Sequence, residues 1–159
     1  QYASKVVEGF QGTPAELKTD QRLLATVKHW VGDGGTEFGK DRGNNRYDEH
    51  LLRNLHASGY FSGLDAGAQA VMVSFNKWVH PNSSKADSTS PAKALPIHGS
   101  HYLITEVLKE KMGFDGVVIS DWNGHEALKG CSVKSCAAAI PAQTTRIQAK
   151  AAWYRCFKM

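Results

Sequence analysis

The sequence predicts an α/β fold with parallel strands, and two observations support this. Three short apolar runs rich in β-branched residues alternate with longer segments of helical periodicity, which is the order of a parallel sheet with crossover helices. Each run also ends in charged or aromatic residues, and long polar loops follow the first two runs. Because active sites of parallel α/β proteins form at the carboxyl ends of the strands, these endings predict a site on one rim.

Spacing and glycine positions predict the first elements. Residues 2–11 are predicted to be helical, since small and apolar side chains recur there at helical spacing and Gly12 ends the segment. Residues 24–31, LATVKHWV, are predicted to form a strand that ends in polar groups. Residues 32–47 hold five glycines and many polar residues, which predicts a long loop.

The remainder of the chain repeats this alternation. In order, the predicted elements are a helix at 48–66, a strand at 70–75, a loop at 79–99, a helix at 102–112, a strand at 116–120 and a short helix at 133–140. A complete (β/α)8 barrel of the TIM type needs about 250 residues and eight strands. The 159 residues and three secure strands of this chain therefore predict part of such a barrel.

Composition and charge exclude several classes of protein. No apolar run reaches the ~18 residues of a membrane span, and no charged leader precedes a long apolar stretch, so we expect no membrane partner. The net charge is +4, and it is unevenly distributed. The segment after Glu126 contains six basic residues and no acidic ones, whereas the first 126 residues carry a net charge of −2. A basic tail can bind nucleic acid, yet this one contains no recognition motif, so we expect no nucleic-acid partner.

The residues at the strand ends are those of a carbohydrate site. Lys28, His29 and Trp30 end the first strand, and Asp121 and Trp122 end the third. Tryptophan rings can stack on the apolar faces of pyranose rings, and charged groups make strong hydrogen bonds to hydroxyls. A carboxylate beneath an anomeric carbon can act as the nucleophile of a retaining glycosidase.

Four segments carry a resemblance to one known family. They closely resemble the N-terminal barrel domain of glycoside hydrolase family 3, and in particular bacterial β-glucosidases and exo-β-glucan glucohydrolases. In order, they are VKHWVGDGGT at 27–36, AVMVSFNKW at 70–78, IHGSHYLITEVLKEKMGFDGVVISDWNGH at 97–125 and GCSVKSCAAAI at 130–140. The resemblance implies that residues 1–140 are part of this barrel domain, with an atypical loop at 80–96, and that residues 141–159 are a basic tail outside the family pattern.

The resemblance also implies the roles of individual residues. Asp121 matches the catalytic nucleophile of the family, and Lys28 and His29 match the pair that binds hydroxyls of the glucosyl unit in subsite −1. Met72 matches a residue that lines this pocket, and Trp122 matches an aromatic residue that clamps the next sugar. No metal and no other cofactor is implied.

Retaining hydrolysis needs two carboxyl groups about 5 to 5.5 Å apart. The family places its general acid/base in a second, C-terminal domain, so the resemblance implies that this domain is a missing partner of the chain. Glu37 and Asp41 lie in a polar loop, and Glu126 follows the strand without matching that role. Asp33 and Arg42 lie in the loop that matches the family, without a definite role carried over.

Other interpretations of these residues remain open at this point. An acid such as Asp121 at a strand end often fixes a loop or caps a helix. The glycines of residues 32–35 resemble a phosphate-binding loop, although no GK[ST] follows. His98 and His101 have a spacing that could bind a metal on a helix, and Trp78 could serve in packing alone.

We therefore expect a retaining β-glucosidase that releases glucose from non-reducing ends, here without its acid/base domain, or else a non-catalytic carbohydrate-binding or structural barrel piece. Relatives with the same cysteine pattern imply a periplasmic or secreted location and a Cys131–Cys136 disulfide, with Cys156 unpaired. The absence of CxxC pairs disfavours zinc. The abrupt change of composition after Ile140 favours a shift of reading frame or a cloning junction there.

Overall fold

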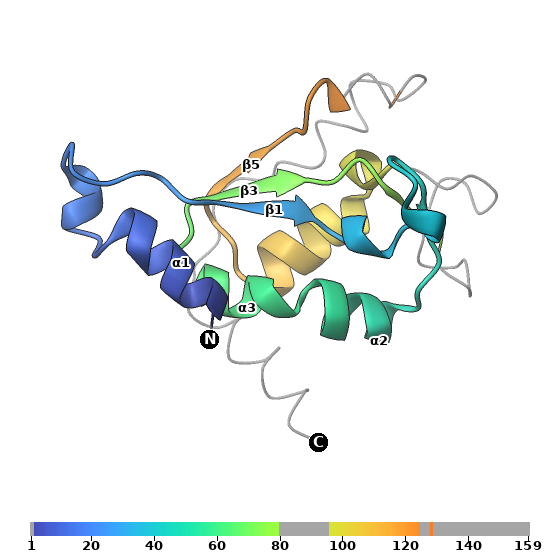
Figure 1. Ribbon diagram of the computed structural model, residues 1–159, viewed down its shortest axis with the longest axis horizontal. Helices are drawn as coiled ribbons and strands as arrows, with labels where there is room; N and C mark the ends of the chain where they lie inside the picture. Colours follow the sequence, from blue (N-terminus) through green and yellow to red (C-terminus); the bar gives the residue numbers. More distant parts are fainter. Residues whose placement is uncertain (1, 80–95, 125–127, 129–159) are drawn as a thin grey trace.

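Three parallel strands form the central sheet of the molecule, in the order β1-β3-β5 (Figure 1). The strands are β1 (Thr26–Trp30), β3 (Ala70–Val73) and β5 (Val117–Ile119). This arrangement confirms the predicted partial (β/α) barrel, and the described strands do not close into a complete one. The computed structural model describes residues 2–79, 96–124 and 128.

Helices cover one face of this sheet (Figure 1). The longer ones are α1 (Tyr2–Gln11), α3 (Ser58–Asp65) and η6 (Tyr102–Lys111), and α1 packs against α3. None of the helices in the described ranges is long and apolar enough to span a bilayer. The short elements are η1 (Glu16–Lys18), η2 (Asp33–Gly35), η3 (Glu37–Gly39), β2 (Asn44–Asn45), α2 (Glu49–Leu51), η4 (Leu52–His56), β4 (Lys77–Trp78) and η5 (Ile97–Gly99).

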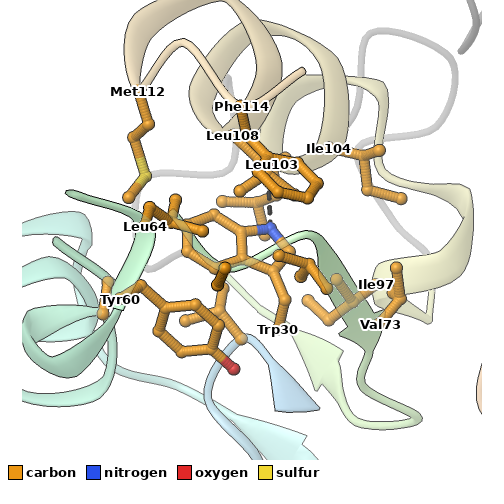
Figure 2. Close-up of a cluster of buried hydrophobic side chains, with 14 of the residues drawn as sticks. Trp30, Tyr60, Leu64, Val73, Ile97, Leu103, Ile104, Leu108, Met112 and Phe114 are labelled. Atoms are coloured by element: carbon orange, nitrogen blue, oxygen red, sulfur yellow. Dashed lines mark hydrogen bonds between the residues drawn. The ribbon is translucent and has the colours of Figure 1, made fainter. Parts of the chain in front are cut away.

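The apolar core lies between the sheet and the helices, with Trp30 at its centre (Figure 2). This side chain is 1% exposed, packs edge-on against Tyr60 with ring centroids 4.9 Å apart, and donates a hydrogen bond from Nε1 to the carbonyl of Leu103 at 3.0 Å. Val71 and Val73 of β3 are also buried in this core. Because side chains alternate along a strand, Met72 lies on the opposite face of the sheet, which would line the interior of a complete barrel.

Gln11, a buried polar residue, joins the first helix to the beginnings of two strands. Its side-chain oxygen accepts hydrogen bonds from the backbone N–H groups of Ala25 at 3.0 Å and Gln69 at 3.1 Å. Its amide nitrogen donates to the carbonyl of Gly67 at 2.9 Å. The C-terminus of α1 is thereby fixed beside the entries of β1 and β3.

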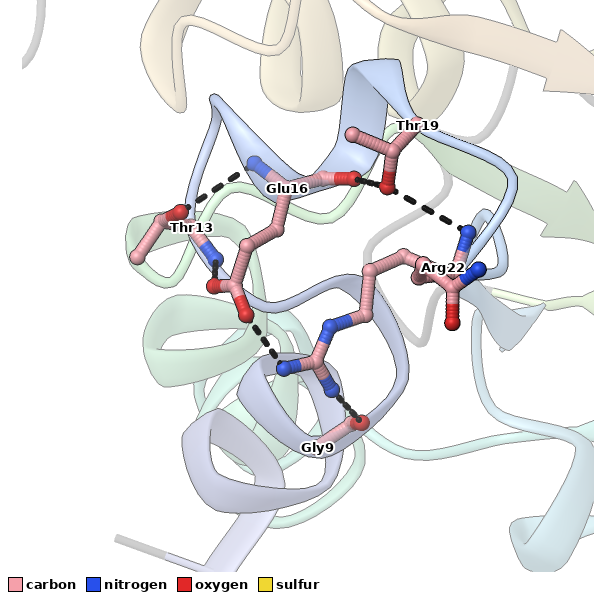
Figure 3. Close-up of polar contacts among 6 residues, drawn as sticks. Gly9, Thr13, Glu16, Thr19 and Arg22 are labelled. Carbon is pink, nitrogen blue, oxygen red and sulfur yellow. Dashed lines mark hydrogen bonds and ion pairs between the residues drawn. The ribbon is translucent and has the colours of Figure 1, made fainter.

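A polar network holds the turn between α1 and β1 (Figure 3). The N–H of Thr13 donates to Glu16 Oε2 at 2.7 Å, and the N–H of Glu16 donates to Thr13 Oγ1 at 3.2 Å, which is a capping box. Arg22 donates to the other oxygen of Glu16 and to the carbonyl of Gly9. The Thr13 N–H and, next, the Arg22 guanidinium lower the pKa of Glu16 from 4.5 to about 2.

Two segments differ from the sequence-based predictions. The predicted loop at 32–47 contains short 3-10 turns and β2, which pairs in parallel with β4. The predicted helix at 48–66 is interrupted at Ala57, where a wide helical turn meets α3. Two-residue strands carry no hydrophobic period, so their pairing is fixed by tertiary contacts.

The helix at 2–11 and the three strands are confirmed, although each strand is shorter than predicted. The predicted loop at 79–99 contains η5 at its end, and the helix predicted at 102–112 is present as η6. The helix predicted at 133–140, the tail at 141–159 and the three cysteines lie outside the described residues.

Candidate active site

The glycines of the loop after β1 allow close packing of the backbone. Gly32 has a φ of +95°, and a Cβ there would lie 2.7 Å from the side-chain nitrogen of Asn45, which itself donates to the Gly32 carbonyl at 2.9 Å. A Cβ at Gly35 would lie 2.5 Å from both Asn45 and His56. Asn45 is fully buried. Gly32 and Gly35 thus have a packing role, whereas a Cβ at Gly34 would meet no atom within 4 Å.

Asp121 follows β5 after Ser120 and begins a tight turn. Its Oδ1 accepts a hydrogen bond from the N–H of Trp122 at 2.7 Å, and its carbonyl accepts one from the N–H of Gly124 at 2.9 Å. One of the two carboxylate oxygens of Asp121 therefore does fix the turn, as the alternative interpretation of this residue expects. The second oxygen is available for a different contact.

His29 lies beside that second oxygen. Its Nε2 is 3.6 Å from Asp121 Oδ2, and its Nδ1 is 3.7 Å from Asp33 Oδ2 on the other side of the ring. Both His29 and Asp121 are about one-quarter exposed, so they are accessible but partly shielded from water. Tertiary structure thus brings together two predicted site residues that are 92 positions apart, one on β1 and one just after β5, the two outer strands of the sheet.

The other predicted site residues are neighbours of this pair along the chain or on the sheet. Met72 is half-buried on β3, between the two outer strands, where its register partner is Ile119. Lys28 is exposed on β1 and, in the part of the chain that the structure describes, forms no ion pair with Asp121. Trp122 is 82% exposed, which leaves its ring open for stacking.

The two histidines considered as metal ligands have different partners. His98 Nε2 accepts a hydrogen bond from the backbone N–H of Asp121 at 3.2 Å, whereas His101 Nδ1 lies 3.4 Å from Glu106. Sequence reasoning thus did not identify His98 as a neighbour of Asp121. The only sequence signal was that His98 precedes the predicted helix at 102–112.

Aromatic contacts extend from His98 toward the loop after β1. The Phe75 ring is 5.2 Å from the His98 ring, and the Arg42 guanidinium lies 4.2 Å above the centre of Phe75. Trp78, by contrast, is buried and donates from Nε1 to the carbonyl of Tyr47 at 2.9 Å, so packing accounts for it.

The two candidate acids in the loop each lie beside an arginine. Arg46 donates to Glu37 at 2.7 Å, and Arg42 lies 3.6 Å from Asp41, which is exposed. Glu126 lies outside the described residues.

A cavity of about 310 Å³ lies elsewhere, between the helical segments that contain His50 and Val107. Its lining includes Met112 and Trp30, and none of Lys28, His29, Met72, Asp121 and Trp122. The cavity is therefore a gap in the helical layer and not the site at the strand ends. The expectation that Trp30 belongs to the carbohydrate site is wrong, because its ring is buried in the core and cannot stack on a sugar.

A carboxylate at the end of a parallel strand, beside an imidazole and an exposed tryptophan, defines a site of the barrel-enzyme class. Comparison with known families identifies the family of barrel enzymes to which the chain belongs. The family model described as "Glycosyl hydrolase family 3 N terminal domain" matches residues 1–145, and the chain belongs to this family of glycoside hydrolases.

Three relatives indicate the kind of enzyme in which similar chains occur. The chain is 32% identical to the "Periplasmic beta-glucosidase" of Salmonella typhimurium over 92% of its own length and 16% of that protein. It is 45% identical to the exo-1,3/1,4-beta-glucanase of a Pseudoalteromonas species, with a TM-score of 0.67, over 79% of this chain and 14% of that one. It is 27% identical to the Listeria innocua beta-glucosidase in complex with isofagomine, with a TM-score of 0.66, over 80% of this chain and 16% of that one. The chain thus spans about one-sixth of these relatives.

Proposed function

We propose that this chain contributes the nucleophile and part of subsite −1 of a retaining β-glucosidase, with Asp121 as the nucleophile. The observation that carries the proposal is the position of Asp121, whose Oδ1 is fixed by the Trp122 N–H while Oδ2 is directed toward His29. Membership of a glycoside hydrolase family and similarity to β-glucosidases support the same assignment.

The proposed reaction has two steps. In the first, the Asp121 carboxylate forms a bond to the anomeric carbon while the glycosidic C–O bond breaks, and the leaving oxygen takes a proton from an acid. In the second, water attacks the anomeric carbon, the conjugate base of that acid removes a proton from the water, and the carboxylate is released. Glucose leaves with its anomeric configuration retained.

The remaining predicted residues bind the sugar in this proposal. Lys28 and His29 hydrogen-bond to hydroxyls of the glucosyl unit, Met72 lines the floor of the pocket, and Trp122 stacks on the next sugar. The acid/base comes from a second domain of the complete enzyme. Without it, hydrolysis of alkyl glucosides should fall by about 10² to 10⁴-fold, the usual contribution of general acid catalysis.

Covalent trapping tests the nucleophile directly. A 2-deoxy-2-fluoro-β-glucosyl fluoride should label Asp121, because fluoride leaves without protonation, and peptide mass spectrometry would locate the adduct. In the complete polypeptide that contains this chain, Asp121→Asn and Asp121→Ala should lower kcat by several orders of magnitude, while Asp41→Asn is the control. An adduct on another residue, or more than about a tenth of wild-type kcat in both Asp121 variants, would refute the assignment.

Two relatives are periplasmic β-glucosidases by name, and we extend this location, or secretion, to the protein that contains this chain. Cell fractionation of the native producer, followed by immunodetection of the chain, tests it. Recovery of the chain in the cytoplasmic fraction alone would contradict the proposal.

A further inference from the structure

We propose that His98 is a positioning residue that fixes the turn carrying Asp121, an inference that rests on the proposed role of Asp121 as nucleophile. The backbone N–H of Asp121 donates to His98 Nε2 at 3.2 Å, and this hydrogen bond joins segments 23 positions apart. Because Nε2 accepts this bond, the neutral ring carries its proton on Nδ1. The contact is to the backbone of the same residue whose carboxylate faces His29.

The His98 ring also contacts the end of the turn. A Cβ placed on Gly124 would overlap His98 Nε2 and would lie 2.5 Å from two ring carbons, so only glycine leaves room for the ring there. The N–H of Gly124 donates to the Asp121 carbonyl at 2.9 Å and closes the turn. The imidazole therefore contacts both ends of the turn from residue 121 to 124.

His98 is itself held by the core and the neighbouring loops. It belongs to η5 (Ile97–Gly99), whose first residue is fully buried and donates from its backbone N–H to the carbonyl of Asn76 at 3.0 Å. The ring lies against Phe75, which in turn carries the Arg42 guanidinium on its face. Through His98, the segment after β3 and the loop after β1 are connected to the turn after β5.

These contacts fix Asp121 from two directions. His98 holds its backbone, and His29 lies beside its free carboxylate oxygen. If the hydrogen bond to His98 is lost, the part-buried N–H loses its partner and the turn can rotate, which moves the carboxylate away from the anomeric carbon. A displacement of about 1 Å can slow a reaction by ~10²-fold even when substrate still binds.

A pair of variants of similar length separates the hydrogen bond from packing. His98→Gln keeps an acceptor at the reach of Nε2, whereas His98→Met fills similar space with only a weak acceptor. We expect His98→Met to lower kcat and the rate of Asp121 labelling by about 10- to 100-fold with KM changed less than about threefold, and His98→Gln to stay within about threefold of wild type. His101→Met is the control, because His101 contacts Glu106 instead.

Gly124→Ala provides an independent test from the other side of the contact. Its Cβ would displace the ring or the turn, so it should slow labelling as His98→Met does. The double variant should lose little more than either single one, because both changes break the same contact. Matching melting temperatures across the set would show that slower labelling is not a loss of fold.

The outcomes distinguish this inference from the proposed function. If the wild-type adduct forms on a residue other than Asp121, the proposed function fails. If it forms on Asp121 but His98→Met is labelled at the wild-type rate, the positioning role is wrong and the nucleophile assignment stands. Equal impairment of His98→Gln and His98→Met would also overturn the inference, because the ring would then act by packing alone.

Discussion

Replacement of Gln11 by methionine removes three hydrogen bonds at the entry of the sheet with little change in side-chain length. Two of them are accepted from the backbone N–H groups of Ala25 and Gln69, and one is donated to the carbonyl of Gly67. Gln11 is 3% exposed, so water cannot take its place without opening the structure. The substitution therefore isolates the contribution of one buried amide to the junction of α1, β1 and β3.

The expected cost follows from what each partner retains. The buried N–H of Ala25 is left without an acceptor, which costs about 1 to 3 kcal/mol, and the part-buried N–H of Gln69 adds about 1 kcal/mol. Gly67 loses less, because its carbonyl still accepts a hydrogen bond from the Gln69 side chain at 2.7 Å. Burial of the more apolar methionine offsets about 1 kcal/mol. The net loss of unfolding free energy should be about 1 to 3 kcal/mol.

Urea unfolding of wild type and variant measures this loss, with Gln21→Met as the control. Gln21 is exposed, and within the described part of the chain its side-chain amide hydrogen-bonds to the neighbouring Asp20 alone, so its replacement should change stability by less than about 0.5 kcal/mol. Amide hydrogen exchange gives a local measurement. The N–H groups of Ala25 and Gln69 should exchange at least about tenfold faster in Gln11→Met.

Two results would refute this reasoning. One is a decrease in the free energy of unfolding for Gln11→Met that does not exceed the decrease for Gln21→Met. The other is unchanged exchange at both Ala25 and Gln69, which would mean that these amides do not depend on Gln11 as their acceptor. A global loss of stability with unchanged exchange at the two amides would place the cost elsewhere in the fold.

Three further predictions concern other parts of the chain. Glu16→Gln should remove a stabilising contribution that is present above pH 4.5 and is lost as the pH falls from 4.5 toward 2, because the pKa of Glu16 in the folded state is lowered to about 2. The difference in urea midpoint between variant and wild type should therefore vanish at the acid end of this range, and a difference independent of pH would contradict the prediction. Trp30→Phe should destabilise by about 2 to 4 kcal/mol through the cavity and the lost hydrogen bond to the Leu103 carbonyl, measured by thermal unfolding, and a loss below about 1 kcal/mol would show that the core repacks. Periplasmic expression should yield a Cys131–Cys136 disulfide in non-reducing mass spectrometry, whereas two free thiols would count against it.

The sequence predicted the regular elements and the location of the site because their signals are local. The helix at α1 has an apolar spacing that ends at Gly12, and β3 and β5 are short runs of β-branched and apolar residues. The acid of SDW follows the run of β5 after a single serine, so its place at a strand end follows from the order of the residues. The quoted segments also predicted the family, which the match to residues 1–145 confirms.

Local signals could not predict features that depend on contacts between distant residues. The pairing of β2 with β4 joins two-residue strands, and no period is visible in so short a segment. The predicted helix at 48–66 contains no proline, so the sequence gives no signal for its interruption at Ala57. Gln11 shows no sign in the sequence that it will be buried, since glutamine is usually exposed and its three partners lie on other elements.

The candidate site shows the same division. Residue order alone determined that Asp121 and the Lys28-His29 pair end parallel strands, because strand runs and their polar endings are encoded in consecutive residues. Tertiary structure alone decided that His29 faces one carboxylate oxygen and that His98, which sequence reasoning treated as a metal candidate, holds the Asp121 backbone. The physical reason is that a short-range contact between side chains depends on sheet order, strand register and the path of the intervening loops. These are set by packing over the whole fold and not by the neighbours of any one residue.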